Sequence, residues 1–196
     1  LFRSKEGYTL DITGSGISIQ ASAPAGVFYA VQTLKQLLQK EQAAYRFPCV
    51  EIADSPAFPW RGFLLDEARN FQGKKEVKKL LDEMAMLKMN VFHWHLTDDQ
   101  GWRIEIKKYP RLTEVGGRRD STQLNWYEST VYDKKPVSGY YTQKDIREIV
   151  AYAAERHITI VPEIEFPGHA SAAIAAYPWL GCSKKEIPVS CAYGVF

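Results

Sequence analysis

Apolar and polar residues alternate at the start of the chain and then change to a helical spacing. The alternation covers residues 8–12 and 17–21, on either side of Gly14-Ser15-Gly16. A two-residue period interrupted by a glycine turn predicts a β-hairpin with one buried face. A helix is expected after Pro24, packed against the hairpin. Its predicted buried stripe consists of Val27, Ala30, Val31, Leu34 and Leu38.

A short strand is expected at residues 50–52, which would complete a small α+β unit. Prolines then interrupt the pattern at residues 56 and 59, so we place a domain boundary there and predict domains 1–57 and 58–196.

From Trp60 onwards the pattern predicts strands alternating with helices. Expected strands cover residues 62–65, 90–96 and 158–161, and helices with apolar stripes cover residues 77–87 and 142–154. Repeated strand-helix steps produce parallel strands with right-handed crossovers, as in an α/β barrel or a doubly wound sheet. No glycine-rich phosphate loop follows any of these strands, which disfavours nucleotide binding.

Polar side chains follow all three predicted parallel strands. Ligands bind at the carboxyl ends of such strands, so polar clusters at three successive strand ends favour the mouth of a barrel. His93 and His95 lie two positions apart and therefore share one face of their strand. The polar residues are Asp66, Glu67 and Arg69 after the first strand, Asp98 and Asp99 after the second, and Glu163, Glu165 and His169 after the third.

Composition narrows the class of function. The net charge of +2 is spread over lysine pairs that alternate with acids, which gives no basic patch for nucleic acid. The sequence contains no run of eighteen apolar residues, so it predicts no membrane-spanning helix. The first residue is Leu1, so we expect the natural start to lie upstream. Cys182 and Cys191 either pair across a loop or remain free thiols.

The segment between residues 112 and 141 is long for a connection inside a compact domain. It is rich in Arg and Tyr and contains Trp126. Long connections of this kind are usually functional or mobile, and this one is expected to form the rim of a pocket.

These motifs together resemble the β-N-acetylhexosaminidases of glycoside hydrolase family 20. The segment 25–34 is similar to part of the small α+β domain that precedes the barrel in that family. Four motifs occur in the family's order across almost the whole chain: residues 25–34, 60–69, 90–102 and 161–169.

The resemblance implies a (β/α)8 barrel, preceded by part of a small α+β domain, and the removal of terminal β-linked N-acetylglucosamine or N-acetylgalactosamine. The implied mechanism is substrate-assisted and retaining, with the sugar's own acetamido oxygen attacking the anomeric carbon. The implied partners are N-acetylhexosamine-terminated glycans. We expect no cofactor and no bound metal, and an extracytoplasmic location follows from the resemblance alone.

Carried over residue by residue, Arg69 matches the arginine that binds the sugar's outer hydroxyls, for which a planar fork of donors is suited. Asp98 and His169 match the pair that positions the general acid. Glu165 stands where many members have Asp, so its reach is one methylene longer. We expect His95 and Trp102 to join Arg69 in contacting the substrate. Separately, Asn70 replaces a histidine that is common in the family.

The family's catalytic Asp-Glu pair, which follows a Gly-Gly at the end of the fourth barrel strand, has no counterpart in the sequence. The Asp-Glu dipeptides at residues 66–67 and 82–83 belong to a different motif and to a helix. General acid-base catalysis contributes roughly 10²- to 10⁴-fold in rate. We therefore expect this chain to be an N-terminal fragment of a longer hydrolase and to be nearly inactive alone.

Two alternatives remain open. His93 and His95 lie about 6.6 Å apart along the strand, close enough to share a metal ion in a metal-dependent hydrolase. Asp98, Glu163 and His169 would complete that metal site. The other alternative is a carbohydrate-binding remnant that holds a sugar at Arg69 without cleaving it.

Overall fold

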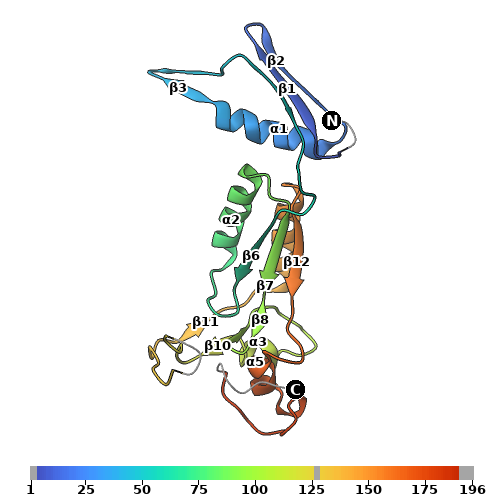
Figure 1. Ribbon diagram of the computed structural model, residues 1–196. Helices are drawn as coiled ribbons and strands as arrows, with labels where there is room; N and C mark the ends of the chain where they lie inside the picture. Colours follow the sequence, from blue (N-terminus) through green and yellow to red (C-terminus); the bar gives the residue numbers. More distant parts are fainter. Residues whose placement is uncertain (1–3, 126–128, 190–196) are drawn as a thin grey trace.

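The computed structural model describes residues 4–125 and 129–189, so Trp126 and Cys191 lie outside the described part. The amino-terminal unit is a three-stranded antiparallel sheet in the order β2-β1-β5, covered on one side by a helix (Figure 1). Its elements are β1 (Tyr8–Thr13), β2 (Gly16–Ala21), α1 (Pro24–Leu37) and β5 (Val50–Asp54), which confirms the predicted hairpin, helix and strand.

The predicted buried stripe of α1 is partly wrong. Val27 and Leu38 are each 43% exposed, whereas the predicted Ala30 is buried against the sheet together with Tyr29, which was not predicted. The helix approaches the sheet through Gly26, where an added Cβ would lie 2.5 Å from the carbonyl oxygen of Gly7. This close approach turns the face of Gly26 inward, which leaves Val27 turned toward solvent.

A second hairpin follows α1 and was not predicted. It consists of two exposed three-residue strands, β3 (Gln39–Glu41) and β4 (Ala44–Arg46). Strands this short and exposed carry no apolar alternation, so the pattern gave no signal for them.

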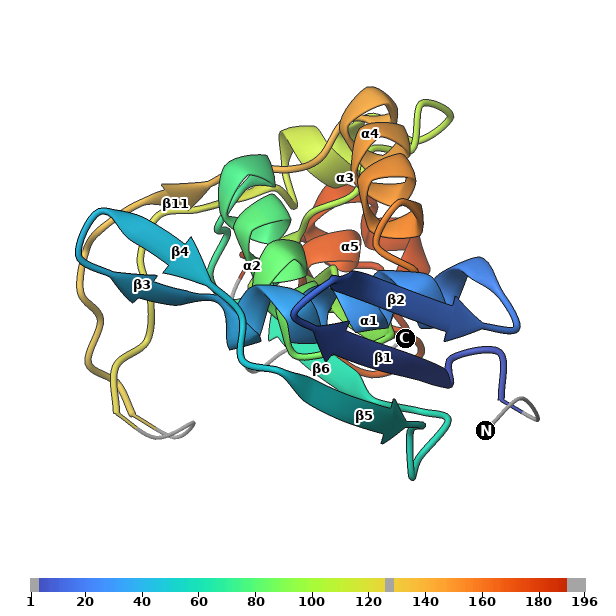
Figure 2. The same cartoon turned by 90° about the horizontal axis from the view of Figure 1, so that it is seen from above.

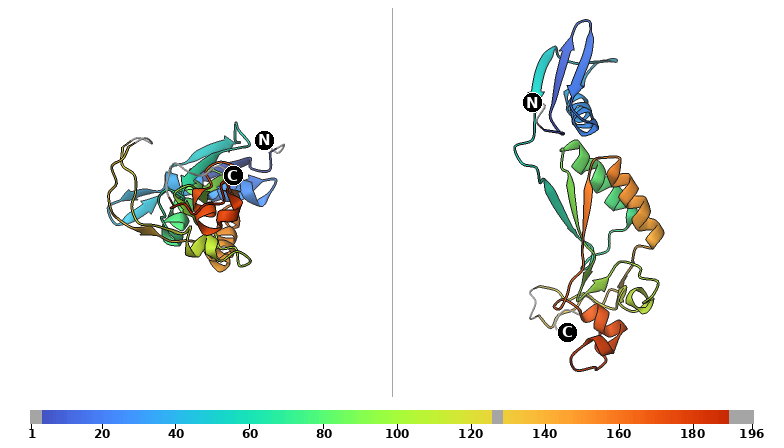
Figure 3. Two further views of the ribbon diagram at one scale, coloured as in Figure 1. Left: turned by 90° about the horizontal axis from the view of Figure 1, so that it is seen from below. Right: turned by 90° about the vertical axis from the view of Figure 1, so that its right-hand side faces the viewer.

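The second unit is a parallel sheet in the order β12-β7-β6, with α2 and α4 packed on one face (Figure 3). This arrangement confirms the α/β class predicted from the sequence, and the sheet does not close into a barrel within the described residues. The elements are β6 (Gly62–Asp66), α2 (Lys74–Met86), β7 (Val91–His95), α4 (Gln143–Ala154) and β12 (Thr159–Glu163).

The two faces of this sheet differ in chemistry. Phe92 and Trp94 point from β7 into the core beneath the helices and are almost fully buried. The alternate residues His93 and His95 lie on the opposite face. The register places Asp66, His95 and Glu163 side by side across the three strands, so the polar groups predicted at separate strand ends form one row.

Both helices begin and pack largely as expected. Thr142 and Asp145 form the predicted capping box, with the Asp145 amide donating to the Thr142 hydroxyl over 3.1 Å. Three residues of the predicted stripes are exposed, namely Leu87, Val150 and Ala154. Leu87 lies beyond the end of α2, and Val150 borders an apolar hollow of about 490 Å³ between α4 and the free edge of β12.

The short elements gather at the carboxyl end of the parallel sheet (Figure 1). The long connection at residues 112–141 belongs to this group and contains regular structure, and its role as a pocket rim stays a prediction. The elements are β8 (Thr97–Asp98), β9 (Gly101–Trp102), α3 (Arg111–Glu114), β10 (Arg118–Arg119), β11 (Val137–Ser138), α5 (Ser171–Ala176) and η1 (Pro178–Leu180).

The small sheet lies at the other end, above the amino ends of the parallel strands. Figure 2 looks down on its strands, with α1 lying between them and the helices of the second unit. The Arg61 guanidinium donates to both carboxylate oxygens of Glu6, over 3.2 and 2.7 Å, and the Lys88 ammonium lies 2.8 Å from Asp54. These contacts fix the small unit away from the polar strand ends.

Within the described part, no helix combines the length and the apolar character that crossing a bilayer requires.

We expect a polypeptide of these 196 residues alone to self-associate. β6 and β12 are edge strands among the described residues, and Phe63 and Leu64 of β6 are 42% and 47% exposed. Unpaired apolar edges template pairing with other chains. Light scattering over a range of protein concentrations tests this, and a monodisperse monomer that melts cooperatively would contradict it.

Candidate functional site

The Asp98 carboxylate is the centre of the polar cluster at the strand ends. Its side chain is 1% exposed, and its oxygens lie 2.7 Å from Arg69 Nη2, 3.1 Å from His95 Nε2 and 3.2 Å from His169 Nδ1. Arg69, Asp98 and His169 are remote in sequence, and the structure brings them together. Their roles toward a substrate stay predictions.

A tight hairpin places Asp98. β8 pairs with β9 so that Asp98 lies opposite Gly101, and the Asp99 amide donates to an Asp98 oxygen over 2.6 Å. A Cβ at Gly101 would lie 2.5 Å from the Arg103 guanidinium and 2.7 Å from the Ala68 carbonyl oxygen. Glycine is therefore needed for the hairpin to pack this closely against the first strand's end.

The partners of Asp98 keep it ionised. Burial by itself raises the pKa of this carboxyl, but the hydrogen bond from His95, the Asp99 amide and the charges of Arg69 and His169 together hold it below its ordinary value. The same hydrogen bond to Asp98 raises the pKa of His95 above its usual range, against the effect of burial.

Arg69 is held by three partners at once. Its Nη1 lies 2.9 Å from Asp66 Oδ2, its Nε donates to Gln100 Oε1 over 2.8 Å, and its Nη2 faces Asp98. The side chain is still 41% exposed. A planar guanidinium fixed in this way keeps an open side for a ligand without further ordering.

A second group of carboxylates lies at the carboxyl end of β12, where Glu163 is the last residue of the strand and Glu165 follows it. Glu163 Oε2 lies 2.5 Å from His93 Nε2, and its Oε1 lies 3.6 Å from His95 Nδ1. The Glu165 amide donates to the Thr97 hydroxyl over 2.9 Å, which fixes the turn after the strand. A hydrogen bond between the two carboxyl groups raises the pKa of Glu165, and like-charge repulsion from Glu163 adds to it.

Two fully buried charged residues, Arg103 and Glu67, form a frame beneath the cluster that the sequence pattern does not predict. Arg103 is fully buried and donates to four backbone carbonyls, and burial lowers its pKa to about 10. Nothing in the local pattern of Arg103 distinguishes it from a surface arginine. The four carbonyls, which join the first-strand end to the long connection, belong to Glu67, Ala68, Gly117 and Gly139.

Glu67 is the second member of this frame. It is fully buried, accepts a 2.7 Å hydrogen bond from the Tyr141 hydroxyl and another of 2.7 Å from the Gln72 amide, and burial raises its pKa. The motif containing Glu67 was noted in the sequence, whereas the partner Tyr141, 74 residues away, was not.

Trp102 faces inward. It is 9% exposed, its indole N–H donates to the Ile104 carbonyl over 2.8 Å, and its ring packs against Leu112 and Ala172. The ring also lines an aromatic hollow that contains Glu165. Substrate contact by Trp102 stays a prediction. Because its indole N–H already donates to the Ile104 carbonyl, such a contact would use the face of the ring.

The five residues of the metal-site alternative do not form one group among the described residues. Four of the five fall into two separate sets, in each of which the candidate ligand atoms lie within 4.8 Å of one another, and His93 belongs to neither set. Glu165 and Asp99, which that alternative did not name, each complete one of the sets. The sets are His95 with Glu163 and Glu165, and Asp98 with Asp99 and His169.

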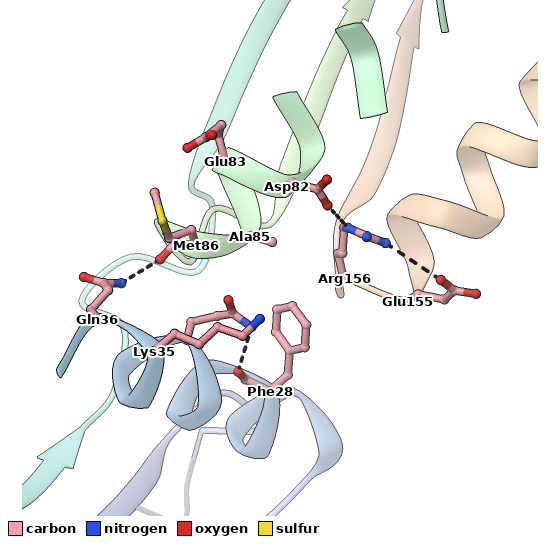
Figure 4. Close-up of a pocket in the computed structure, with 10 residues that line it drawn as sticks. Phe28, Lys35, Gln36, Asp82, Glu83, Ala85, Met86, Glu155 and Arg156 are labelled. Atoms are coloured by element: carbon pink, nitrogen blue, oxygen red, sulfur yellow. Dashed lines mark hydrogen bonds and ion pairs between the residues drawn. The ribbon is translucent and has the colours of Figure 1, made fainter. Parts of the chain in front are cut away.

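A further hollow, of about 640 Å³, lies between α1, α2 and the end of α4 (Figure 4). Gln36 donates to the Met86 carbonyl over 2.9 Å on one side of it, and Arg156 contacts Asp82 over 2.6 Å on the other. It lies toward the small sheet, at the end of the parallel strands opposite to that where ligands bind in this class. The strand-end cluster is therefore the better candidate site.

Tyr141→Phe is expected to lower the free energy of unfolding by about 1–3 kcal/mol, because it leaves a buried Glu67 oxygen without its donor. Tyr140→Phe is a matched control, since Tyr140 is its sequence neighbour and 43% exposed. Urea denaturation of both variants measures the difference. Equal midpoints for the two would show that the buried hydrogen bond does not stabilise the frame.

Asp98→Asn is expected to lower the pKa of His95, because the hydrogen bond to Asp98 is the largest cause of its elevation. The shift can be followed from the imidazole proton resonances of His95 during an NMR pH titration. Asp82→Asn, remote from the cluster and paired with Arg156, should leave that titration unchanged. If His95 titrates identically in the wild type and in Asp98→Asn, the hydrogen bond to Asp98 is not the cause of its raised pKa.

Comparisons with known proteins agree with the fold and the strand-end motifs. Residues 58–195 match the family described as "Glycosyl hydrolase family 20, catalytic domain", and residues 2–55 match its "domain 2". A "Beta-hexosaminidase" of Porphyromonas gingivalis is 50% identical over 97% of this chain and 24% of its own length. An "N,N'-diacetylchitobiase" of Vibrio harveyi is 43% identical over 86% of this chain and 20% of its own length.

Solved structures give the same result. The beta-N-acetylhexosaminidase from Bacteroides fragilis superposes with a TM-score of 0.81 at 44% identity, covering 96% of this chain and 36% of that one. An exo beta-N-acetylglucosaminidase from Vibrio harveyi, in complex with N-acetylglucosamine, superposes with a TM-score of 0.81 at 40% identity. The match covers 90% of this chain and 28% of that one. The chain spans about a quarter of its curated relatives' length, and it belongs to glycosyl hydrolase family 20.

Proposed function

We propose that the protein containing this chain is a β-N-acetylhexosaminidase, which removes terminal non-reducing N-acetylglucosamine or N-acetylgalactosamine from glycans. The observation that carries the proposal is the meeting of Arg69, Asp98 and His169 at the carboxyl end of a parallel sheet, in a chain of family 20. We also propose a location outside the cytoplasm, which rests on the family resemblance alone.

In the proposed reaction the substrate supplies its own nucleophile, the acetamido oxygen, and this chain binds and orients the sugar. Arg69 offers the open side of its guanidinium to vicinal hydroxyls, where a planar fork of donors makes paired hydrogen bonds. Its hold on Asp66, Gln100 and Asp98 fixes that fork before the sugar arrives. Fixed donors reduce the ordering that binding requires.

Asp98 and His169 have a positioning role in this proposal. Asp98 is ionised and buried, and His169 is 56% exposed with Nδ1 directed at the Asp98 carboxylate. An imidazole oriented by a buried carboxylate can hold a further group through its other nitrogen. We propose that this group is the general acid, and that Glu165 supports the same arrangement from the third strand.

The general acid and the aspartate beside it are proposed to come from a part of the protein outside this sequence. Without them, these residues bind and orient a sugar but have no group to protonate the leaving oxygen. The chain alone is therefore proposed to be nearly inactive, with turnover lower by at least about 10²-fold than in the complete protein.

Arg69→Lys in the complete protein is expected to lower kcat/KM for a chromogenic N-acetyl-β-glucosaminide by about 10- to 100-fold, because a point charge replaces the paired donors. Arg118→Lys is a matched control, since Arg118 is an exposed arginine that pairs only with Asp120 in the described contacts. Wild-type rates in Arg69→Lys, or an equal loss in both variants, would contradict the proposed role.

The non-catalytic alternative predicts a different result. If the complete protein binds N-acetylglucosamine in a calorimeter and turns over no chromogenic N-acetylhexosaminide, the protein is a sugar-binding remnant.

A further inference from the structure

Arg119 is a buried arginine in the long connection, where it forms part of β10. It is 5% exposed, and its guanidinium reaches the turns that follow the first two parallel strands. Its Nη2 donates to the Arg69 carbonyl over 2.6 Å, and its Nη1 donates to the Gln100 carbonyl over 3.2 Å. The Thr122 hydroxyl accepts from its Nε and Nη2 over 3.2 and 2.9 Å. One guanidinium therefore joins the main chains of two separate turns.

The two residues that Arg119 holds also contact each other through their side chains. Arg69 Nε donates to Gln100 Oε1 over 2.8 Å, so a closed ring of hydrogen bonds runs through both turns. The Arg69 amide donates to Asp66 Oδ1 over 3.0 Å, and Asp66 Oδ2 accepts from Arg69 Nη1. The direction of the Arg69 guanidinium therefore depends on where its main chain is held as well as on its side-chain partners.

Regular structure does not hold these two residues. Arg69 lies in the turn after β6, and Gln100 lies in the turn between β8 and β9. A carbonyl in such a turn has no neighbouring strand to donate to it, although a polar main-chain group away from water needs a partner. Arg119 supplies a donor to the carbonyl of each residue in place of a strand.

Arg119 extends the frame that Arg103 forms. Arg103 donates to the carbonyls of Glu67 and Ala68 over 3.1 and 3.0 Å, and Arg119 donates to the next carbonyl, that of Arg69. Burial lowers the pKa of Arg103, and the nearby charge of Arg119 lowers it further. Two like charges placed together in the interior are unfavourable unless their hydrogen bonds offset the cost. Those hydrogen bonds converge on the segment that ends in Arg69.

The long connection is itself fixed against the hairpin that contains Gln100. β10 packs against β9, and Figure 1 shows β10 at the carboxyl end of the parallel sheet. The Trp102 amide donates to the Gly116 carbonyl over 2.8 Å, and the Thr122 amide donates to an Asp133 oxygen over 2.8 Å. Arg119 therefore comes from a segment whose own position is set.

We propose that Arg119 is a positioning residue for sugar binding, which holds the main chains of Arg69 and Gln100 so that the Arg69 guanidinium is directed at the substrate. Because Arg119 is buried, it acts through Arg69 and not on the sugar. The inference rests on the proposed hydrolase function and deepens it. It makes the long connection part of the binding machinery although its arginine does not touch the ligand.

The test is a double-mutant cycle in the complete protein, measured as kcat/KM for a chromogenic N-acetyl-β-glucosaminide. Arg119→Lys keeps the charge but replaces the fork that spans two carbonyls with one donor atom. We expect it to lower kcat/KM by about 5- to 20-fold, because a misplaced binding group loses much of its effect. In an Arg69→Lys background the same change should cost less than about 2-fold, because the fork that Arg119 positions is already absent.

A residue that only stabilises the fold gives a different result, because its loss multiplies with that of Arg69→Lys. The division of the effect between kcat and KM in Arg119→Lys should also follow that of Arg69→Lys. Arg118→Lys is the matched control, since the neighbouring Arg118 side chain is 66% exposed, and it should leave kcat/KM unchanged in both backgrounds. Ile149→Val, in the fully buried core, is a destabilising variant whose factor should be equal in both backgrounds.

Thr122→Val keeps the inference testable if Arg119→Lys does not fold. It removes the hydroxyl that accepts from Arg119 and leaves the guanidinium in place. It should lower kcat/KM by about 2- to 5-fold in the wild-type background and have little effect in Arg69→Lys.

Equal factors in the two backgrounds, or wild-type rates in Arg119→Lys, overturn the inference and leave the hydrolase proposal standing. Where only Thr122→Val folds, the same two outcomes for that variant overturn it. If the complete wild-type protein turns over no N-acetylhexosaminide, the hydrolase proposal fails and this inference fails with it.

Discussion

The strand-end cluster depends on the pairing of one buried carboxylate, that of Asp98, with the basic side chains around it. Placing a charge where its side chain is 1% exposed is costly unless partners replace the lost water. Arg69, His95 and His169 are those partners, and each comes from a different position along the chain. The compensation of one charge therefore links three strand ends through Asp98, and the same hydrogen bond raises the pKa of His95.

The backbone beneath this cluster is held by polar contacts of the same kind. Arg103 and Glu67 are both fully buried, and each uses its hydrogen-bonding groups to hold main-chain segments that otherwise have no regular structure. Irregular loops are usually mobile, and here they carry the candidate binding groups. A frame built from buried charges fixes them where strands and helices do not reach, which suits a site that must hold donors at set positions.

The small sheet and the candidate site lie at opposite ends of the parallel strands. Arg61 and Lys88 join the small unit to the amino ends of those strands through Glu6 and Asp54. Parallel strands present their carboxyl ends to ligands, so this attachment leaves the polar row unobstructed. The family 20 relationship and the superposition on solved hexosaminidases agree with this arrangement of the two units.

The sequence by itself determined the fold class and most of its elements. Alternation before Gly14 gave the hairpin, and the Thr142 capping box gave the start of α4, because hydrophobic period and capping chemistry are local properties. Motifs in a known order also predicted that Arg69, Asp98 and His169 converge, and the structure brings them together, while their role as site residues stays a prediction. The sequence was partly wrong about which side of α1 is buried, since the contact of Gly26 with Gly7 helps to decide that.

Only the tertiary structure decided which polar residues meet and which are buried. The local sequence around Arg103 is typical of a surface arginine, and Tyr141 lies in a predicted loop, yet both side chains are buried. The row formed by Asp66, His95 and Glu163 depends on strand register, which no single strand specifies. The meeting of Trp102, Tyr177 and Trp179 around one hollow also depends on how segments far apart in the chain pack together. Hydrogen bonds form between residues up to 84 positions apart, so the local pattern of one segment does not show which of its polar groups will be buried or paired.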